Sequence, residues 1–126
     1  MNDRQKYFLY ARKSTDVEDK QVLSIEAQIT ELRKYARDNG LFVVDTIIEK
    51  KSAKVSGRPK FGAMLGRIEA GEASGIITWH PDRLARNSVD GGQIVYLLDQ
   101  TRLQSLKFPT FWFENTSQGE FMLSIA

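Results

Sequence analysis

The feature that most constrains the fold of this chain is the alternation of short apolar runs with longer segments of helical periodicity. The runs are rich in β-branched and aromatic residues, which favour strands. They lie at residues 7–11, 41–48, 75–79 and 109–113. Strands that alternate with helices imply right-handed βαβ crossovers and a mainly parallel sheet. The sequence therefore predicts one α/β domain in three layers, α/β/α, with a sheet of four to five strands.

The helices expected between these strands have recognisable ends. Ser24 is suited to cap the start of the first helix, and Gly40 to end it in a left-handed conformation. Pro59 fits the first turn of the second helix, which Gly71 closes. A third helix is expected over residues 88–100, after a loop or tight helical turn. The apolar residues expected to face the sheet are Ile25, Ile29, Leu32, Ala36, Phe61, Met64, Leu65, Ile68, Ile94, Val95, Leu97 and Leu98.

The composition is that of an ordinary globular protein, and it excludes several kinds of site. The 126 residues are 41% hydrophobic and 27% charged, which suits a single domain with its own core. There is no cysteine, so disulfides, thiolate zinc sites and cysteine nucleophiles are excluded. No apolar run approaches the roughly 20 residues that span a bilayer. We therefore expect a soluble, cytoplasmic protein with no membrane partner.

The charge is unevenly distributed along the chain. Residues 1–60 hold 13 Lys and Arg against 9 Asp and Glu, whereas residues 61–126 hold 5 against 7. This asymmetry suggests one basic face, as in proteins that bind nucleic acid. Charge alone, however, favours an ordinary solvated helix surface.

Two basic clusters follow the first and third expected strands. Arg12 and Ser14 come after the first strand, and Arg83 and Arg86 come after the third. The first and third strands are commonly neighbours in doubly wound sheets, so their loops would share one crevice. Three guanidinium groups beside one hydroxyl call for an anionic partner, and a phosphodiester supplies one. Asp82 on its own is better explained as a structural ion pair, but one aspartate cannot neutralise three arginines.

A basic loop follows the second expected strand and opens on the same edge. Arg58 directly precedes Pro59, so it could add a fourth guanidinium at a helix N-terminus, where anions bind. A surface loop that has no part in the site accounts for Arg58 equally well. In the first interpretation Lys54 and Lys60 contact the DNA backbone, and in the second they only aid solubility.

Taken together, these motifs resemble those of the serine recombinases, the resolvase/invertase family that also includes phage-type integrases. The matching segments are YARKS at 10–14, SIEAQ at 24–28, GRP at 57–59 and DRLAR at 82–86. The resemblance runs from about residue 7 to the end of the chain, and it implies a resolvase-like catalytic domain. It further implies that Ser14 attacks a DNA phosphodiester, forms a 5′-phosphoserine link and frees a 3′ hydroxyl. Strand rejoining then completes site-specific recombination without a metal ion, another cofactor or an external energy source.

The resemblance implies a role for each matching position. The arginines expected to hold the scissile phosphate and to stabilise the transition state are Arg12, Arg58, Arg83 and Arg86. Asp82 would orient them, Gln28 would support the site through hydrogen bonds, and Tyr10 would pack beside it. The implied partners are double-stranded DNA and further copies of the chain, as a dimer to tetramer in the full-length protein.

The activation of Ser14 leaves one question open. A serine hydroxyl is a poor nucleophile unless a base or a nearby positive charge activates it. His80 is the only histidine, so a Ser-His-Asp triad has one candidate base and no visible orienting group. Clustered arginines favour the alkoxide by charge. The general base is therefore unidentified, and His80 is more simply a structural residue.

The end of the chain shapes the expected domain boundary. An apolar helical pattern begins at residue 119 and has no closing turn by residue 126. We therefore expect residues 1–126 to form a catalytic domain truncated at the start of the family's long C-terminal helix, without the DNA-binding region. Such a fragment would bind DNA weakly and recombine nothing.

Other functions and subfamilies remain open on the sequence. One alternative is a phosphate-ester hydrolase on a Rossmann-like sheet, although Asp45, Glu49 and Asp82 form no obvious metal set. Another is an interaction domain without catalysis, but the presence of Ser14 and its arginines argues against this alternative. Within the family, a small resolvase or invertase and a large integrase or transposase are both compatible with the sequence. The loop at residues 15–23 favours the large class.

Overall fold

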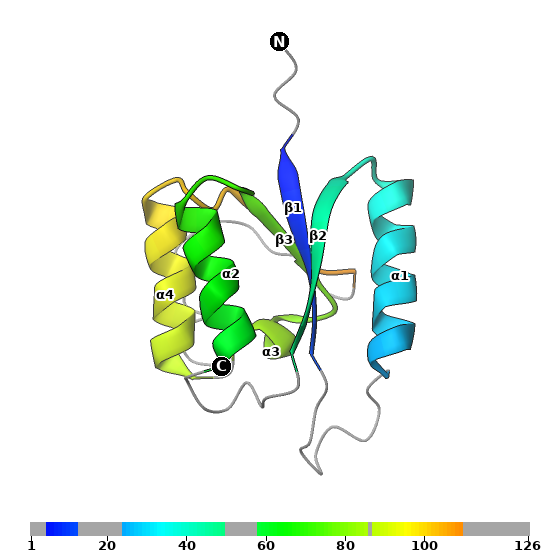
Figure 1. Cartoon of the computed structure of the whole chain (residues 1–126), viewed down its shortest axis with the longest axis horizontal. Helices are drawn as coiled ribbons and strands as arrows, with labels where there is room; N and C mark the ends of the chain where they lie inside the picture. The colour runs from blue at the N-terminus through cyan, green and yellow to red at the C-terminus, as the bar shows by residue number, and fades with distance from the viewer. Residues whose placement is uncertain (1–4, 13–23, 50–57, 86, 110–126) are drawn as a thin grey trace.

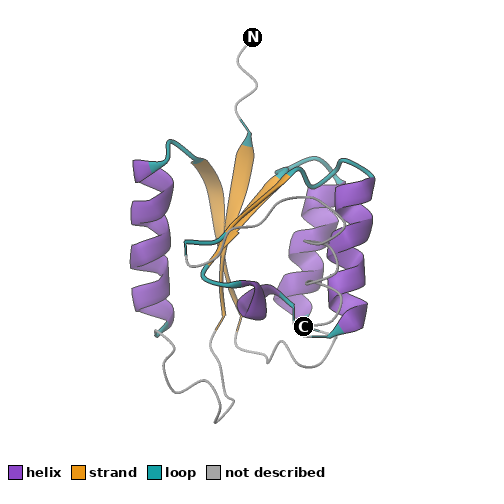
Figure 2. Ribbon diagram, turned by 180° about the vertical axis from the view of Figure 1, so that it is seen from behind, coloured by secondary structure: helices purple, strands orange, loops and turns teal. Residues whose placement is uncertain are grey.

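The computed structural model describes residues 5–12, 24–49, 58–85 and 87–109. These residues form a four-stranded sheet, all of whose strands are parallel, with helices on both faces (Figure 1). In chain order the elements are β1 (Lys6–Arg12), α1 (Ile25–Asp38), β2 (Phe42–Glu49), α2 (Pro59–Glu69), β3 (Gly75–Thr78), α3 (Pro81–Leu84), α4 (Ser88–Asp99) and β4 (Ser105–Lys107). Helix α1 covers one face, and α2, α3 and α4 lie on the other (Figure 2). The predicted α/β/α architecture is confirmed.

The strand order places the ends of β1 and β3 side by side. The order is β2-β1-β3-β4, and Tyr10 of β1 is paired with Thr78 of β3. The predicted neighbourhood of the first and third strands is therefore confirmed. Because all four strands are parallel, their carboxyl ends lie along one edge of the sheet. Helix α3 lies at this edge, the lower one in Figure 1.

The fourth strand differs from its prediction. The fourth described strand, β4, occupies Ser105–Lys107, and Pro109, where a strand was expected to begin, lies in a turn. Residues 110–113 lie outside the described residues. In the sequence, the aromatic run at residues 109–113 is a stronger strand signal than the short segment at residues 105–107. An edge strand, however, needs few apolar residues. Leu106 is the buried residue of β4, and its two neighbours are half-buried.

Strand β2 contains an irregularity that the sequence did not reveal. Tyr7 of β1 is paired with Val43, whereas the next residue, Phe8, is paired with Asp45. Val44 is therefore an additional residue in β2, and its side chain is exposed. Strand β2 is an edge of the described sheet. Such β-bulges are common at sheet edges, where they bend the strand and increase its twist.

The helix ends agree with the sequence signals. The Ser24 hydroxyl accepts a hydrogen bond from the Ala27 amide at 3.1 Å, and Gly40 after α1 has a φ of +66°. Pro59 is the first residue of α2, and Gly71 beyond its end has a φ of +89°. These four signals are confirmed. Within the described ranges, no helix has the length and apolar character needed to cross a bilayer.

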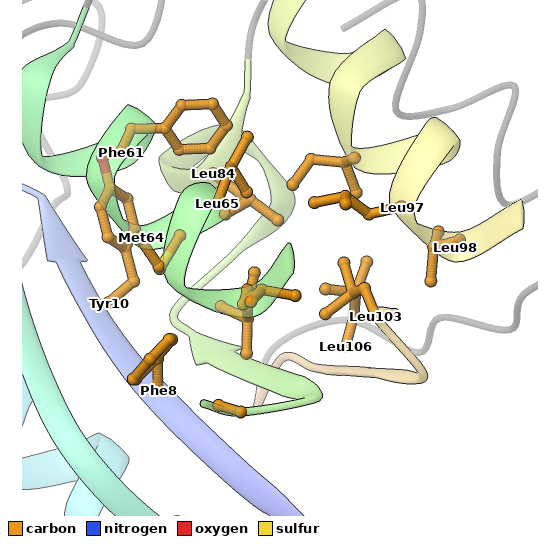
Figure 3. Packing of buried hydrophobic residues seen from close by; sticks show 14 of the residues in the cluster. Phe8, Tyr10, Phe61, Met64, Leu65, Leu84, Leu97, Leu98, Leu103 and Leu106 are labelled. Atoms are coloured by element: carbon orange, nitrogen blue, oxygen red, sulfur yellow. The ribbon is translucent and has the colours of Figure 1, made fainter. Parts of the chain in front are cut away.

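The sheet separates two hydrophobic clusters of unequal size. The larger lies under α2 and α4 and contains Phe8, Tyr10, Phe61, Met64, Leu65, Ile68, Ala73, Ile76, Leu84, Ile94, Leu97, Leu98, Leu103, Leu106 and Phe108 (Figure 3). The smaller lies under α1 and contains Tyr7, Leu9, Leu32, Ala36 and Ile77. The expected inward stripes of α2 and α4 are buried, apart from Val95, which is partly buried against the larger cluster. In α1, Leu32 and Ala36 are buried, whereas Ile25 and Ile29 are only partly so.

Candidate active site at the carboxyl edge of the sheet

The described part of the candidate site lies where β1, β2 and β3 end. Ser14, Lys54 and Arg86 lie outside the described residues, as does the side chain of Asp82 in α3. Lys60 is exposed in the first turn of α2. The other predicted site residues are Tyr10, Arg12, Gln28, Arg58 and Arg83, and all five are buried. They come from β1, α1, α3 and the residue before α2. Hydrogen bonds join Arg12 to Gln28 and Arg83, and Arg58 to Tyr10.

Gln28 holds the last residue of β1. Its side-chain Nε2 donates to the Arg12 carbonyl at 3.0 Å, and its Oε1 accepts from the Arg12 amide at 3.4 Å. The amide group of Gln28 therefore pairs with the backbone of Arg12 much as a neighbouring strand would. These two hydrogen bonds fix the backbone of Arg12, two residues before Ser14 in the sequence.

Arg12 joins the end of β1 to α3. Its side chain is fully buried, and its Nε donates to the Arg83 carbonyl at 3.2 Å. Arg83 itself is only 3% exposed. The two arginines, which the sequence placed after different strands, therefore share one buried region. Burying a guanidinium is costly unless acceptors surround it, so this contact also contributes to the stability of the edge.

Arg58 is the most enclosed of these arginines. Its side chain is 0% exposed, and its guanidinium carbon lies 3.9 Å from the centre of the Phe61 ring. Nη1 donates to the Tyr10 hydroxyl at 2.9 Å, and Nη2 donates to the Leu84 carbonyl at 2.6 Å. Among the described residues, its Nε has no hydrogen-bond acceptor. The interpretation of Arg58 as part of a surface loop is therefore wrong.

Asp90 is a residue that sequence reasoning missed. It lies in the first turn of α4, is 2% exposed, and its Oδ2 accepts from Arg58 Nη2 at 3.0 Å. The same oxygen accepts from Asn87 Nδ2 at 3.0 Å, while Asn87 Oδ1 accepts from the Asp90 amide at 2.8 Å. The only signal in the sequence was an Asn–x–x–Asp pair at a helix start, which is a capping pattern. That pattern explains the helix but does not indicate a buried partner for Arg58.

Tyr10 and Glu49 complete the described surroundings of Arg58. Burial raises the pKa of the Tyr10 hydroxyl above its ordinary value of 10.0; the Arg58 guanidinium opposes this shift, and the Glu49 carboxylate adds to it. Glu49 ends β2, and its Oε1 accepts from the Phe61 amide at 2.7 Å. The carboxylate thereby caps the N-terminus of α2, for which the side chain of Arg58 provides no cap. Glu49, which the sequence did not assign to a metal set, therefore binds a helix end.

The charges of this edge favour an anion. Three buried guanidiniums, from Arg12, Arg58 and Arg83, lie at the edge that also holds the carboxylates of Asp90 and Glu49. Guanidinium groups remain charged at every physiological pH and match the oxygens of a phosphate. The described residues therefore give the end of β1 a positive environment suited to a phosphodiester.

Comparisons with known proteins agree with this geometry. The family model "Resolvase, N terminal domain" matches residues 7–126. Among solved structures, the chain is similar to the N-terminal catalytic domain of TP901-1 integrase, with 25% identity, a TM-score of 0.71, and coverage of 96% of this chain and 90% of that one. It is also similar to a resolvase family site-specific recombinase from Streptococcus pneumoniae, with 25% identity, a TM-score of 0.69, and coverage of 97% and 83%.

A more distant structure shares the fold. The C-terminal catalytic domain of ISC1926 TnpA, an IS607-like serine recombinase, has 20% identity and a TM-score of 0.67, with coverage of 93% of this chain and 75% of that one. A comparison with curated protein sequences gives no match. The family model, in contrast, spans every described helix and strand from residue 7 onward. The chain therefore belongs to the family of resolvase N-terminal domains.

Proposed function

We propose that this chain is the catalytic domain of a serine site-specific recombinase that cleaves and rejoins double-stranded DNA. The observation that carries the proposal is the convergence of Arg12, Arg58 and Arg83 in one buried network two residues before Ser14. Family membership supports it independently. A serine two residues beyond a strand end lined by guanidiniums is well suited by its sequence position to attack an anion.

The proposed reaction is a reversible transesterification. The Ser14 Oγ attacks the phosphorus of a DNA phosphodiester, the bond to the 3′ oxygen breaks, and that oxygen takes up a proton while the serine hydroxyl loses one. The product is a 5′-phosphoserine and a free 3′ hydroxyl. Attack by a 3′ hydroxyl from another strand reverses the step, restores a phosphodiester and frees Ser14. One ester bond replaces another throughout, so the exchange needs no external energy source.

The proposed roles of the arginines follow from charge. Arg12, Arg83 and Arg86 hold the phosphate and stabilise the negative charge that develops on its oxygens in the transition state. Arg58 adds a further positive charge, and Asp82 orients the arginines beside it. Gln28 fixes the backbone of Arg12, and Tyr10 stays neutral and holds Arg58. Their described contacts support the last two roles.

The wider partners of the site belong to the same proposal. Lys54 and Lys60 contact the DNA backbone, where each neutralised phosphate makes binding more sensitive to salt. Exchange between two duplexes breaks four strands, and each break needs one Ser14. The full-length protein therefore acts as a homo-oligomer that assembles from dimers into a tetramer.

A covalent trapping experiment tests the proposal. The full-length protein is incubated with a plasmid that carries the DNA flanking its own gene, quenched in denaturant, and examined for protein attached to a 5′ end. We expect an adduct with the wild type and none with Ser14→Ala. Release of inorganic phosphate in place of an adduct would identify a phosphate-ester hydrolase. The absence of both products would point to an interaction domain.

A further inference from the structure

We propose that Asp90 is a positioning residue of the recombinase site. Asp90 holds the guanidinium of Arg58, and Arg58 in turn fixes the backbone of α3 next to Arg83. The inference rests on the proposed function and adds to it a residue in α4, outside every motif that indicated the site.

The contacts of Arg58 tie three elements together. Nη1 binds Tyr10 of β1, while Nη2 binds the Leu84 carbonyl of α3 and the Asp90 carboxylate of α4, at 2.6 and 3.0 Å. Leu84 directly follows Arg83. A displacement of the Leu84 backbone therefore moves Arg83. The guanidinium of Arg58 is the bridge that sets the distance between this backbone and β1.

The bridge depends on a buried counter-charge. The side chains of Arg58 and Asp90 are 0% and 3% exposed, so water cannot replace either partner. A buried charge persists only when it is paired and hydrogen-bonded. Among the described residues, Asp90 is the carboxylate hydrogen-bonded to Arg58. Without it, the guanidinium would be driven toward solvent or toward another acceptor, and its bond to Leu84 would be lost.

Asp90 is itself held rigidly. Asn87 caps α4, donating from Nδ2 to the Asp90 carboxylate and accepting the Asp90 amide on Oδ1. The carboxylate is thereby fixed to the first turn of a 12-residue helix. The line of contacts runs from Asn87 through Asp90 and Arg58 to Leu84. Each member is located by two hydrogen bonds or by the helix backbone, which is the property required of a positioning shell.

The same contacts distinguish the role of Arg58 from that of an arginine that binds the phosphate directly. Both Nη atoms already donate to protein acceptors, and the Phe61 ring covers one face of the guanidinium. A phosphate oxygen that bound Nη2 would have to displace Leu84 or Asp90. In this arrangement Arg58 acts on the reaction through its charge and through the position of α3.

The test measures single-turnover adduct formation by the full-length protein on the plasmid that carries the DNA flanking its own gene. Asp90→Asn keeps the size of the side chain and removes its charge. We expect its adduct rate per folded molecule to fall about 100-fold, the loss typical of a small misplacement of catalytic groups. DNA affinity, measured by anisotropy, is expected to stay unchanged because phosphate-backbone contacts elsewhere dominate it. Asp99→Asn, at an exposed aspartate of the same helix, is expected to react at the wild-type rate.

A second variant keeps the inference testable if Asp90→Asn does not fold. Asn87→Ser retains a good capping oxygen but lacks the Nδ2 amide group that donates to Asp90. We expect it to fold and to form the adduct about tenfold more slowly, a smaller loss because the charge pair survives. Arg58→Lys provides a coupling test, since adding Asp90→Asn to it is expected to cost much less than in the wild type.

The outcomes separate the inference from the proposed function. Wild-type adduct rates in both Asp90→Asn and Asn87→Ser would overturn the positioning role alone. A lower melting temperature with an unchanged rate per folded molecule would also overturn it, because Asp90 would then be only structural. A wild-type protein that forms no adduct would overturn the proposed function and the positioning role together.

Discussion

At the scale of single residues, two of the buried arginines donate hydrogen bonds to the backbone of a very short helix, α3. The Nε of Arg12 donates to the Arg83 carbonyl, and Arg58 donates to that of Leu84. Both carbonyls end α3, which has four residues, and the last carbonyls of a helix have no partner within it. Each guanidinium thus donates to a carbonyl that has no partner within the short helix, and the same hydrogen bond fixes the guanidinium in place. The stability of the edge and the placement of its charges therefore have the same cause.

Removing one of these charges should stop cleavage. Arg12→Ala and Arg83→Ala are each expected to lower the rate of adduct formation by about 100- to 1000-fold, or roughly 3 kcal/mol of barrier. The measurement is single-turnover trapping, with circular dichroism as the check on folding. Arg102→Ala is the matched control, because Arg102 is exposed and donates to the Glu69 carbonyl at 3.3 Å, away from the site. Cleavage at the wild-type rate by either site variant would contradict the phosphate-holding role.

The shifted pKa of Tyr10 predicts a loss of stability in alkali. Burial raises this pKa in the folded protein above the ordinary value of 10.0. The folded state therefore keeps the proton at a pH where the unfolded chain releases it, so stability is complete below about pH 10 and is lost as the pH rises further. Tyr10→Phe should show a weaker loss between about pH 8 and pH 11 in urea unfolding. Tyr96→Phe, at an exposed tyrosine, is the control, and equal slopes in wild type and Tyr10→Phe would contradict the argument.

Single residues of the candidate site were predictable where they follow soon after the end of an expected strand. Arg12 directly follows the apolar run at 7–11, and Arg83 follows the run at 75–79 after three residues. A parallel sheet brings such positions to one edge. Asp90 was not predictable, because its partner Arg58 lies 32 residues away and the pair forms only through the packing of α4. The helix-capping contact of Glu49 was not predictable for the same reason, since it joins two elements.

At the scale of elements, α2 begins on a carboxylate that another element provides. Its N-cap residue, Arg58, makes no side-chain cap, and Glu49 at the end of β2 accepts the Phe61 amide in its place. A negative charge at a helix N-terminus also interacts favourably with the helix dipole. The end of β2 and the start of α2 are therefore fixed together across the residues that join them.

Loss of this cap should weaken the domain. Glu49→Ala is expected to lower the free energy of unfolding by about 2 kcal/mol, the upper part of the range for lost N-caps, because the site is buried. Urea unfolding measures the change. Glu69→Ala, at an exposed position of the same helix, is the control and should have little effect. A Glu49→Ala protein as stable as the control would show that the cap contributes nothing.

Helices were more predictable than strands at this scale. Ser24, Gly40 and Pro59 each act through the local backbone, so the ends of α1 and the start of α2 follow from the sequence. The position of β4 does not follow from the sequence. In the described sheet β4 is an edge strand, which is defined by its pairing with β3 and contains one buried residue. The bulge at Val44 is likewise a property of the β1–β2 pairing.

At the scale of the whole molecule, the two faces of the sheet are unequally buried. Among the described residues, the cluster under α2 and α4 has 15 buried members, whereas the cluster under α1 has five. Local opening costs less where fewer apolar contacts are broken. Helix α1 should therefore separate from the sheet more readily than the opposite layer, although it carries Gln28 of the site.

Hydrogen exchange tests this asymmetry. Amides of α1 are expected to exchange before those of α2 and α4, and amides of β1 and β3 last, because these two are inner strands of the described sheet. Mass spectrometry of peptides from each element provides the measurement. Exchange in α4 that precedes exchange in α1 would contradict the expected order of opening.

The bulge at Val44 has a consequence beyond the domain itself. Because the pairs on either side of it join Val43 to Tyr7 and Asp45 to Phe8, a chain without Val44 could keep both halves of the ladder. Its outer strand would then present an uninterrupted row of amides and carbonyls, the template on which other molecules add as strands. The extra residue thus acts against aggregation: we expect the deletion to leave the fold intact and to lower solubility.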